Sequence, residues 1–315
     1  MQRVILERDL PGAAQRGELV AYYQPQLEVA SGRVIGAEAL VRWQHPELGL
    51  VPPLDFISIA EETGTIHEVG DFMIEEGCAF AASLEADEIE IAVNVSAVQL
   101  DDPAFSSRVK DAYLRHGLKP EHLTIELTES RPVLDVPAAI AQLDSLRSLG
   151  IGISIDDFGS GYSSLKQLDA LPFTELKIDQ ELIREDTDET WSRVATLVAI
   201  ARHRGLRIVA EGIESQEQYE NVRSAGCDRA QGYFLGLPMP REEFAAFAKA
   251  NVRTPLPKLS AAARRALAAI GVRNLQEVST WKRRELGALH GVGPSTLSAL
   301  ATALAAVGLD FADQS

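Results

Sequence analysis

The stretch Ile151-Gly-Ile-Ser-Ile-Asp-Asp-Phe-Gly-Ser-Gly-Tyr-Ser-Ser164 joins a short apolar run to two adjacent acids and a glycine-rich segment. The near-alternating apolar residues of 151–155 are typical of a short buried strand. Asp156 and Asp157 at its end are poor core residues, because buried like charges repel and each is costly to remove from water. We therefore expect positive charge at this point, and one or two divalent cations would supply it.

The first 250 residues alternate strand-like and helix-like segments. Eight segments have the apolar pattern of strands: Val20–Leu27, Val34–Leu40, Ile89–Val95, Leu123–Leu127, Ile151–Ile155, Glu175–Ile178, Arg207–Ala210 and Arg229–Tyr233. Five segments between them have helical patterns: Asp71–Leu84, Pro103–His116, Pro137–Leu149, Thr190–Arg204 and Gln216–Ala225. Such alternation predicts an α/β fold with a parallel sheet, either doubly wound or closed as a (β/α)8 barrel.

Unusual polar residues end or directly follow most of the strand-like segments. They are Glu38, Asn94, Glu126, Asp156, Asp157, Lys177, Asp179, Glu211 and Gln231. A barrel collects the carboxyl ends of its strands on one face, where active sites are built. Any one of these side chains alone would fit a helix cap or a surface charge. Seven consecutive strand ends that carry acids, amides and one lysine indicate a shared functional site.

Several segments together resemble the signature of the EAL-domain cyclic-di-GMP phosphodiesterases. They are Gly36-Ala-Glu-Ala-Leu-Val-Arg-Trp43, Val93-Asn-Val-Ser96, Glu126-Leu-Thr-Glu129, Asp156-Asp-Phe-Gly-Ser-Gly-Tyr-Ser-Ser-Leu165, Leu176-Lys-Ile-Asp179, Glu211-Gly-Ile-Glu214 and Gln231-Gly-Tyr233. Tyr23-Gln-Pro25 and Phe56-Ile-Ser-Ile-Ala-Glu-Glu-Thr-Gly64 also match, so the resemblance covers roughly residues 3–248 in the family's order. It implies a (β/α)8 TIM-like barrel whose first strand is antiparallel.

The resemblance implies a two-metal phosphodiesterase that opens one phosphodiester of cyclic di-GMP to give linear pGpG. The implied ligands of one Mg²⁺ or Mn²⁺ are Glu38, Asn94, Glu126 and Asp156. Those of a second cation are Asp156 and Asp157, with Glu211 and Gln231 contributing directly or through water. Oxygen ligands suit these cations, and the sequence has no His or Cys cluster that suggests zinc. Two such metals could activate a shared water and neutralise charge on the attacked phosphate.

The resemblance gives further residues a catalytic or supporting role. Lys177 would place positive charge beside the nucleophilic water or the phosphate. Glu211 is the family's general-base candidate, although a bridging hydroxide would make a separate base unnecessary. Gly159 and Gly161 suit a mobile loop that tightens around metal and substrate, and Glu129 would tether this loop.

The residues that resemble family contacts to the dinucleotide are Gln24, Leu40, Arg42 and Tyr233. The guanidinium fork of Arg42 can donate two hydrogen bonds to a phosphate, and the alternative is a salt bridge at the barrel rim. Tyr233 would stack on a guanine or pack in the core. Phe234-Leu-Gly-Leu-Pro238 lacks the serine and basic residue often found there, which affects the expected contact with one base or phosphate and leaves the metal site untouched.

The motifs whose loss usually accompanies loss of catalysis in the family are all present. They are the first metal motif, the Asp156-Asp157 pair, Lys177 and Glu211. We therefore expect an active phosphodiesterase, with a catalytically inactive cyclic-di-GMP receptor or scaffold as the alternative. Family members commonly dimerise through the barrel, so a homodimer is a further expectation.

The formal net charge of −16 is unevenly spread along the 315 residues. Residues 251–315 hold eight Lys/Arg and four Asp/Glu, which leaves 22 basic and 42 acidic residues in the first 250. The acidic part is a poor nucleic-acid binder by bulk electrostatics, so a phosphate substrate must be met by metals and a few placed cations. The asymmetry favours two units with different partners.

Other features of the sequence bear on the compartment. No apolar run reaches the roughly 18–20 residues that a transmembrane helix needs, and the N-terminus carries acids too early for a signal peptide. Cys78 and Cys227 have no metal-ligand spacing and are expected to be reduced. The sequence therefore predicts a cytoplasmic protein that makes no contact with a membrane.

Pro255 and Pro257 mark a linker after the barrel. The predicted division is a barrel over residues 1–250, a linker over 251–258 and a small all-α domain over 259–315. Four segments of this domain predict short helices: Leu259–Ile270, Leu275–Ser279, Lys282–Leu289 and Pro294–Val307.

The C-terminal segment resembles a helix-hairpin-helix module, closest to the C-terminal domain of the bacterial RNA polymerase α subunit, with Gly291-Val-Gly293 as its hairpin. In such modules, backbone N–H groups of the hairpin meet a DNA phosphate. Ser295 and Thr296 stand where a DNA binder often has Lys or Arg. The basic residues that form either a patch or a solvated helix face are Arg264, Arg265, Lys282, Arg283 and Arg284. A weak, salt-sensitive DNA contact, a protein partner and docking on the barrel all remain open.

Overall fold

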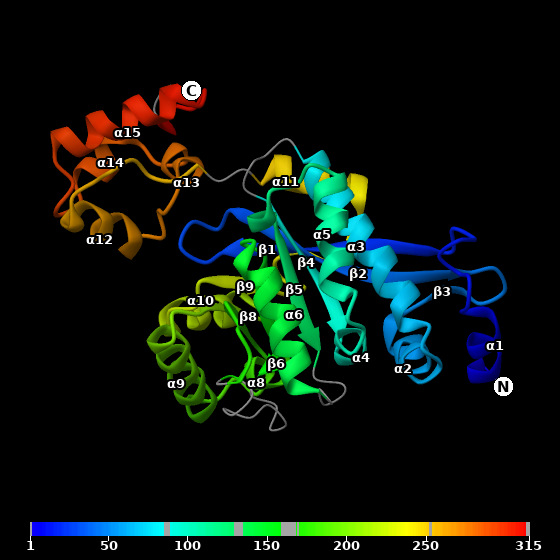
Figure 1. Ribbon diagram of the computed structural model, residues 1–315. Helices are drawn as coiled ribbons and strands as arrows, with labels where there is room; N and C mark the ends of the chain where they lie inside the picture. The colour runs from blue at the N-terminus through cyan, green and yellow to red at the C-terminus, as the bar shows by residue number, and fades with distance from the viewer. Residues whose placement is uncertain are drawn as a thin grey trace. The chain divides into compact units, whose positions relative to one another are not determined.

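Ten strands of the described residues form one sheet, and eight of them close it into a barrel (Figure 1). A computed structural model describes residues 2–84, 89–128, 135–158, 168, 170–251 and 254–312. The barrel strands are β1 (Leu19–Glu28), β2 (Val34–His45), β4 (Glu90–Ser96), β5 (Leu123–Thr128), β6 (Gly152–Phe158), β7 (Glu175–Ile178), β8 (Arg207–Ala210) and β9 (Arg229–Gln231). They follow one another in sequence order, and β1 closes the ring by pairing with β2 and β9. The predicted TIM-like barrel is confirmed.

The first strand runs opposite to the other seven. A short turn joins β1 to β2, and the backbone N–H of Glu28 donates to the carbonyl of Arg33 across it, at 2.9 Å. Each later neighbour, from β2–β4 to β8–β9, pairs in parallel. Two short strands extend the sheet beyond the ring: β3 (Gly49–Val51) pairs with β2, and β10 (Met239–Pro240) pairs with β1, both antiparallel.

Helices connect the strands around the outside of the barrel (Figure 1). They are α1 (Gln2–Asp9), α2 (Pro53–Thr63), α3 (Ile66–Ser83), α4 (Ala97–Leu100), α5 (Phe105–Arg115), the 3-10 turn η1 (Pro120–His122), α6 (Val136–Ser148), α8 (Gln180–Arg184), α9 (Asp188–His203), α10 (Gln216–Ala225) and α11 (Arg241–Ala250). Local signals set several ends: the Thr187 hydroxyl caps α9, and Gly226, with φ 88°, ends α10. All five predicted helices are present, and α3 begins earlier than expected.

The two faces of each barrel strand differ in polarity, because alternate side chains point in opposite directions. In β5, Leu123 and Ile125 are buried apolar residues of the outer face. The alternate residues Thr124 and Glu126 point into the barrel. Thr124 Oγ1 donates to Glu90 of β4, and Glu126 accepts from Lys177 of β7. The barrel interior is therefore polar, and the apolar core lies between the strands and the helices.

A ring of ion pairs fills the end of the barrel where the parallel strands begin. Glu90, Glu175, Arg207 and Arg229 are each the first residue of a strand. Arg207 Nη1 and Arg229 Nη2 donate to Glu90 Oε2 at 2.9 and 2.7 Å, and Arg207 Nε lies 3.1 Å from Glu175 Oε2. Burial favours the neutral form of Glu90, but the two arginines outweigh it and lower the pKa to about 2.

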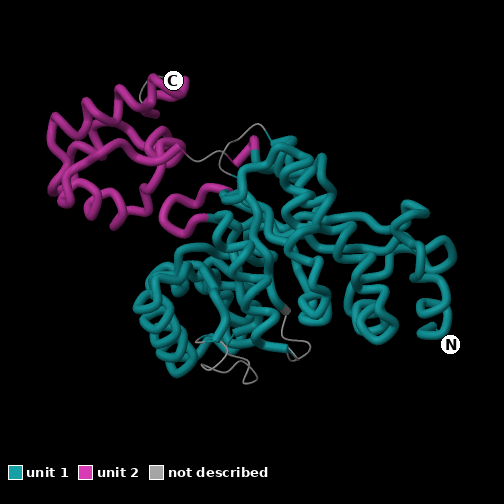
Figure 2. Tube along the Cα trace, in the orientation of Figure 1, with its two compact units in different colours: residues 1–27, 35–248 teal, residues 28–34, 249–315 magenta. Residues whose placement is uncertain are grey.

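The chain divides into two compact units, which Figure 2 colours separately: residues 1–27 with 35–248, and residues 28–34 with 249–315. The second unit holds α12 (Ala261–Ala269), α13 (Leu275–Ser279), α14 (Arg283–Gly287) and α15 (Pro294–Ala306), in the places where the sequence predicts four helices. Leu267, Val278, Leu286 and Leu300 are among the fully buried residues of its own apolar core.

Asn274 links the helices of the second unit to its 28–34 segment. The buried Asn274 side chain caps α13 by accepting from Glu277 N, at 2.9 Å, and donates to the carbonyl of Ser31 at 3.0 Å.

The division of the chain into a barrel that ends at residue 250 and a small domain that begins at residue 259 stays a prediction. Across the described part of the chain, no helix combines the length and apolar character that a membrane crossing requires.

Glu90→Gln should destabilise the protein by about 3 kcal/mol, because two arginines then lose a buried counter-charge. The Glu90 carboxylate contributes fully above its ordinary pKa of 4.5, and its contribution is lost as the pH falls toward the folded value of about 2. Guanidinium unfolding should therefore show a large difference from wild type at pH 7 and a smaller one at pH 3. The exposed Glu121→Gln is the control; equal effects of the two substitutions at pH 7 would contradict a supporting role for the ring.

Candidate functional site

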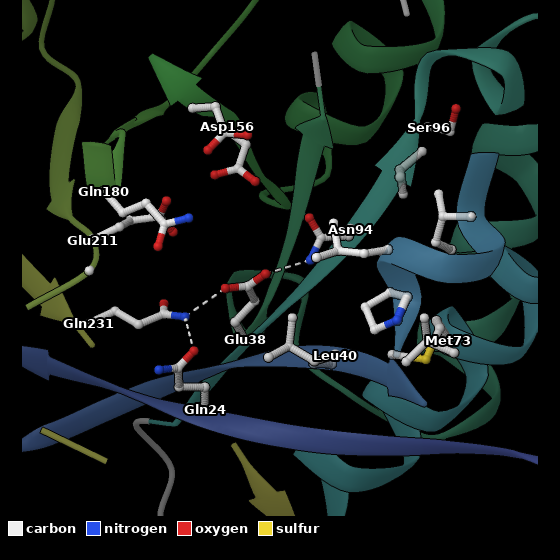
Figure 3. Close-up of a pocket in the computed structure, with 18 of the residues that line it drawn as sticks. Gln24, Glu38, Leu40, Met73, Asn94, Ser96, Asp156, Gln180, Glu211 and Gln231 are labelled. Carbon is white, nitrogen blue, oxygen red and sulfur yellow. Dashed lines mark hydrogen bonds between the residues drawn. The ribbon is translucent and has the colours of Figure 1, made fainter. Parts of the chain in front are cut away.

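The polar residues that follow the parallel strands converge on one pocket with a cavity volume of about 410 Å³ (Figure 3). The predicted site residues that line it are Gln24, Glu38, Leu40, Asn94, Asp156, Asp157, Glu211, Gln231 and Tyr233. Lys177 and Glu126 are fully buried and bond to this set from the barrel interior. One end of the barrel therefore brings together the acids and amides that the sequence places at separate strand ends.

The Lys177 ammonium is the centre of the site. It is 0 % exposed, and its Nζ lies 2.6 Å from Glu211, 2.8 Å from Glu126, 3.0 Å from Asp156 and 3.5 Å from Glu38. Burial alone would lower the pKa of Lys177, but the surrounding carboxylates hold it well above its usual value. Lys177 therefore stays charged and ties four strands to one point.

Two amide side chains hold Glu38 in place. Asn94 Nδ2 donates to Glu38 Oε1 at 2.6 Å, and Gln231 Nε2 donates to Glu38 Oε2 at 2.6 Å (Figure 3). Gln231 Nε2 also donates to Gln24 Oε1 at 3.0 Å. Burial would raise the pKa of Glu38, but Lys177 and these amides lower it. Glu38 is therefore ionised, and the Oδ1 atom of Asn94 is left to accept from another group.

The acid pair sits on a distorted strand end. The pairing of β6 with β7 shifts register between Ile155 and Phe158, and Asp157 adopts φ 52°, which is uncommon for a residue other than glycine. Such bulges re-aim side chains, and strained backbone gathers at functional sites. Carboxylate oxygens of Asp156, Asp157 and Glu211 all lie within 4.8 Å of one another.

The site carries more negative than positive charge. Among the residues that the structure describes, Lys177 faces five acids, which are Glu38, Glu126, Asp156, Asp157 and Glu211. Burial, followed by repulsion from Asp156 and Asp179, raises the pKa of Asp157 to about 7. Burial likewise raises the pKa of both Glu126 and Glu211 well above the usual value, against the effect of Lys177.

This donor set fits a hard divalent cation. Glu126 Oε1 is buried and has no hydrogen-bond partner within the described ranges. This oxygen can therefore bind a cation without the loss of a hydrogen bond to a described residue. Carboxylate and amide oxygens are the ligands that Mg²⁺ and Mn²⁺ prefer. The acidic cluster can therefore hold a metal ion, and a cation would relieve the repulsion among its carboxylates.

Other predicted residues have different positions. Arg42 is not among the described residues that line the pocket; its guanidinium lies 5.6 Å from the ring centroid of Tyr22. Tyr233 is 61 % exposed at the pocket mouth, so it is not a core residue. Asp179 caps α8 by accepting from Glu181 N at 2.7 Å. Glu129 and the loop glycines 159 and 161 lie outside the described residues.

The walls of the pocket include residues that sequence reasoning missed. Pro53, Leu54 and Ile57 of α2 form part of one apolar wall. On another wall, Arg184 Nη2 donates to Glu214 Oε1 at 2.7 Å. Segments 56–64 and 211–214 resemble family motifs, but no periodicity in the sequence indicates that they face the same cavity.

The barrel part of the chain is similar in sequence to known proteins. A family model described as "EAL domain" matches residues 7–238. The bifunctional diguanylate cyclase/cyclic di-GMP phosphodiesterase MucR of Pseudomonas aeruginosa is 43% identical over 251 residues, or 78% of this chain and 36% of that protein. The cyclic di-GMP phosphodiesterase NbdA of the same organism is 35% identical over 269 residues, or 83% and 34% of the two chains. The chain thus spans about a third of the length of these curated relatives.

A solved structure has the same barrel. The PaMucR phosphodiesterase in complex with c-di-GMP aligns with a TM-score of 0.71 and 42% identity, over 76% of this chain and 99% of that one. The barrel is thus similar in fold to that of a protein solved in complex with c-di-GMP.

Affinity for Mn²⁺ should rise about tenfold between pH 6 and pH 8, because a bound cation needs ionised carboxylates and the pKa of Asp157 is about 7 in the metal-free site. Binding should release protons, which calorimetry in buffers of different ionisation enthalpy detects. Asp157→Asn should flatten the pH dependence. An affinity that is independent of pH, with no proton release, would show that these acids do not hold the metal.

Proposed function

Because the chain belongs to the EAL domain family, we propose that it is a phosphodiesterase that hydrolyses cyclic di-GMP to linear pGpG. The observation that carries the proposal is the convergence of five polar residues on one pocket, in front of the buried Lys177 and Glu126. The five are Glu38, Asn94, Asp156, Asp157 and Glu211. Relatives named as cyclic di-GMP phosphodiesterases support the choice of substrate.

We propose two Mg²⁺ or Mn²⁺ ions as cofactors. The residues that would hold one are Glu38, Asn94, Glu126 and Asp156, and those near the other are Asp156, Asp157, Glu211 and Gln231. When bound, the metals would activate a shared water and neutralise charge on the attacked phosphate. Asp156 belongs to both sets, so it is the residue whose carboxylate the site depends on most.

Glu211 is proposed as the group that accepts the proton of the attacking water. Its oxygens lie near those of Asp156 and Asp157, and burial raises its pKa above the ordinary value of a glutamate, which makes its carboxylate a stronger base. Lys177 Nζ holds a Glu211 oxygen at 2.6 Å and so fixes its orientation. Lys177 would also place a permanent positive charge close to the phosphate.

Substrate binding is assigned to the pocket walls and mouth. Gln24 is held by Gln231 and by the carbonyl of Gly236, to which its Nε2 donates at 3.2 Å. Leu40 and the exposed Tyr233 offer apolar and aromatic surface for a base. Arg42 lies above Tyr22 with part of its surface exposed, and we propose that it turns toward a substrate phosphate.

We propose separately that the C-terminal helices make a weak contact with DNA or with a protein. Five basic side chains of this unit are exposed: Arg264, Arg265, Lys282, Arg283 and Arg284. Gly293 begins α15 without a side-chain cap, which leaves first-turn N–H groups to meet a phosphate. Dimerisation through the barrel and a cytoplasmic location remain expectations.

Incubation of the purified full chain with cyclic di-GMP and Mg²⁺ or Mn²⁺ should yield pGpG, which chromatography separates from the substrate. Asp156→Asn should lower turnover at least about 100-fold, because an amide replaces a charged metal ligand, while circular dichroism stays unchanged. Asp144→Asn, an exposed aspartate of α6, is the matched control and should keep wild-type turnover.

Two outcomes of the same assay would overturn the proposal. Binding of cyclic di-GMP without formation of pGpG would identify a receptor rather than an enzyme. Near wild-type turnover by Asp156→Asn would exclude the proposed bridging role of this carboxylate.

A further inference from the structure

A buried carboxylate of α2 contacts the end of the strand that carries Asn94. Glu61 lies on the face of α2 that also buries Phe56, Ile59 and Ala60, where a charged residue is unusual. Ser96 Oγ donates to Glu61 Oε1 at 2.6 Å, and the two residues are only 4 % and 7 % exposed.

Ser96 is also held by two residues of α4. Its backbone N–H donates to Gln99 Oε1 at 3.1 Å, and its Oγ accepts from Val98 N at 3.3 Å, which forms a capping box at the start of α4. Gln99 packs directly on Gly70 of α3, where an added Cβ would lie 1.9 Å from Gln99 Nε2. The end of β4 is thus clamped between α2, α3 and α4.

This clamp lies two residues beyond a proposed metal ligand. Asn94 and Ser96 point to the same face of β4, because strand side chains alternate, and both line the pocket (Figure 3). Asn94 Nδ2 donates to Glu38 Oε1, so the position of its Oδ1 depends on where the strand end is held. An anchor at Ser96 therefore limits the movement of the Asn94 amide.

We propose that Glu61 is a positioning residue, which acts through Ser96 to hold Asn94 in the orientation that a divalent cation requires. Glu61 would touch neither metal nor substrate. Groups behind metal ligands fix their orientation, and loss of such a group typically lowers metal affinity 10–100-fold. The inference rests on the proposed function, since that function assigns Asn94 to the metal.

The test is Mn²⁺ affinity, measured by calorimetry on metal-free full-length protein. Glu61→Met keeps the size of the side chain and removes the acceptor, so it should weaken Mn²⁺ binding about tenfold or more. Glu61→Gln keeps an acceptor for Ser96 Oγ and should stay within about threefold of wild type. Glu62→Met, at the exposed neighbouring position of α2, should bind as wild type does.

A double-mutant cycle with Ser96→Ala separates positioning from general stability. Glu61→Met should change Mn²⁺ affinity less once Ser96 has lost its hydroxyl, because both substitutions remove the Ser96–Glu61 hydrogen bond. A fall in melting temperature with unchanged Mn²⁺ affinity would reduce Glu61 to a structural role and overturn the inference. If wild type hydrolyses cyclic di-GMP and both Glu61→Met and Glu61→Gln bind Mn²⁺ as tightly as wild type, the inference fails and the proposed function stands. If wild type binds no Mn²⁺, the inference and the proposed function both fail.

Discussion

The charge on the buried Lys177 ammonium is the constraint on which the rest of this site depends. A lysine with no exposed surface is stable only among opposite charges, and here four carboxylates from different strands lie within 3.5 Å of its Nζ. These strands reach one point because the sheet closes on itself. Closure of the barrel therefore both buries the lysine and brings these acids together.

The two ends of the barrel interior differ in their balance of acidic and basic side chains. Where the strands begin, Glu90 and Glu175 face Arg207 and Arg229, so acids and bases balance and the pKa of Glu90 falls. Where the strands end, the described residues include five acids around Lys177, and the pKa values of Asp157, Glu126 and Glu211 rise. The first end stabilises the fold. The second remains short of positive charge, which is the property expected of a cation site.

Much of this arrangement could be predicted from the sequence, and the limits have physical causes. Strand periodicity and the rule that barrels gather strand ends place Glu38, Asn94 and Glu126 on one face. Contacts across the barrel, such as those of Lys177 or the Gln231 amide, depend on how the sheet closes, which no local pattern encodes. The Asp157 backbone conformation and the contact of the Arg42 guanidinium with the Tyr22 ring are likewise set by tertiary packing.

The most direct test of the account is an anomalous difference map from crystals of the full chain grown with Mn²⁺. The account predicts manganese peaks beside the Asp156 carboxylate, with Glu38, Asn94 and Glu126 around one of them and Asp157 beside the other. A map without peaks at the strand ends, in crystals where Lys177 still contacts the same carboxylates, would contradict the account. In that case the excess of acids at this site would not bind metal.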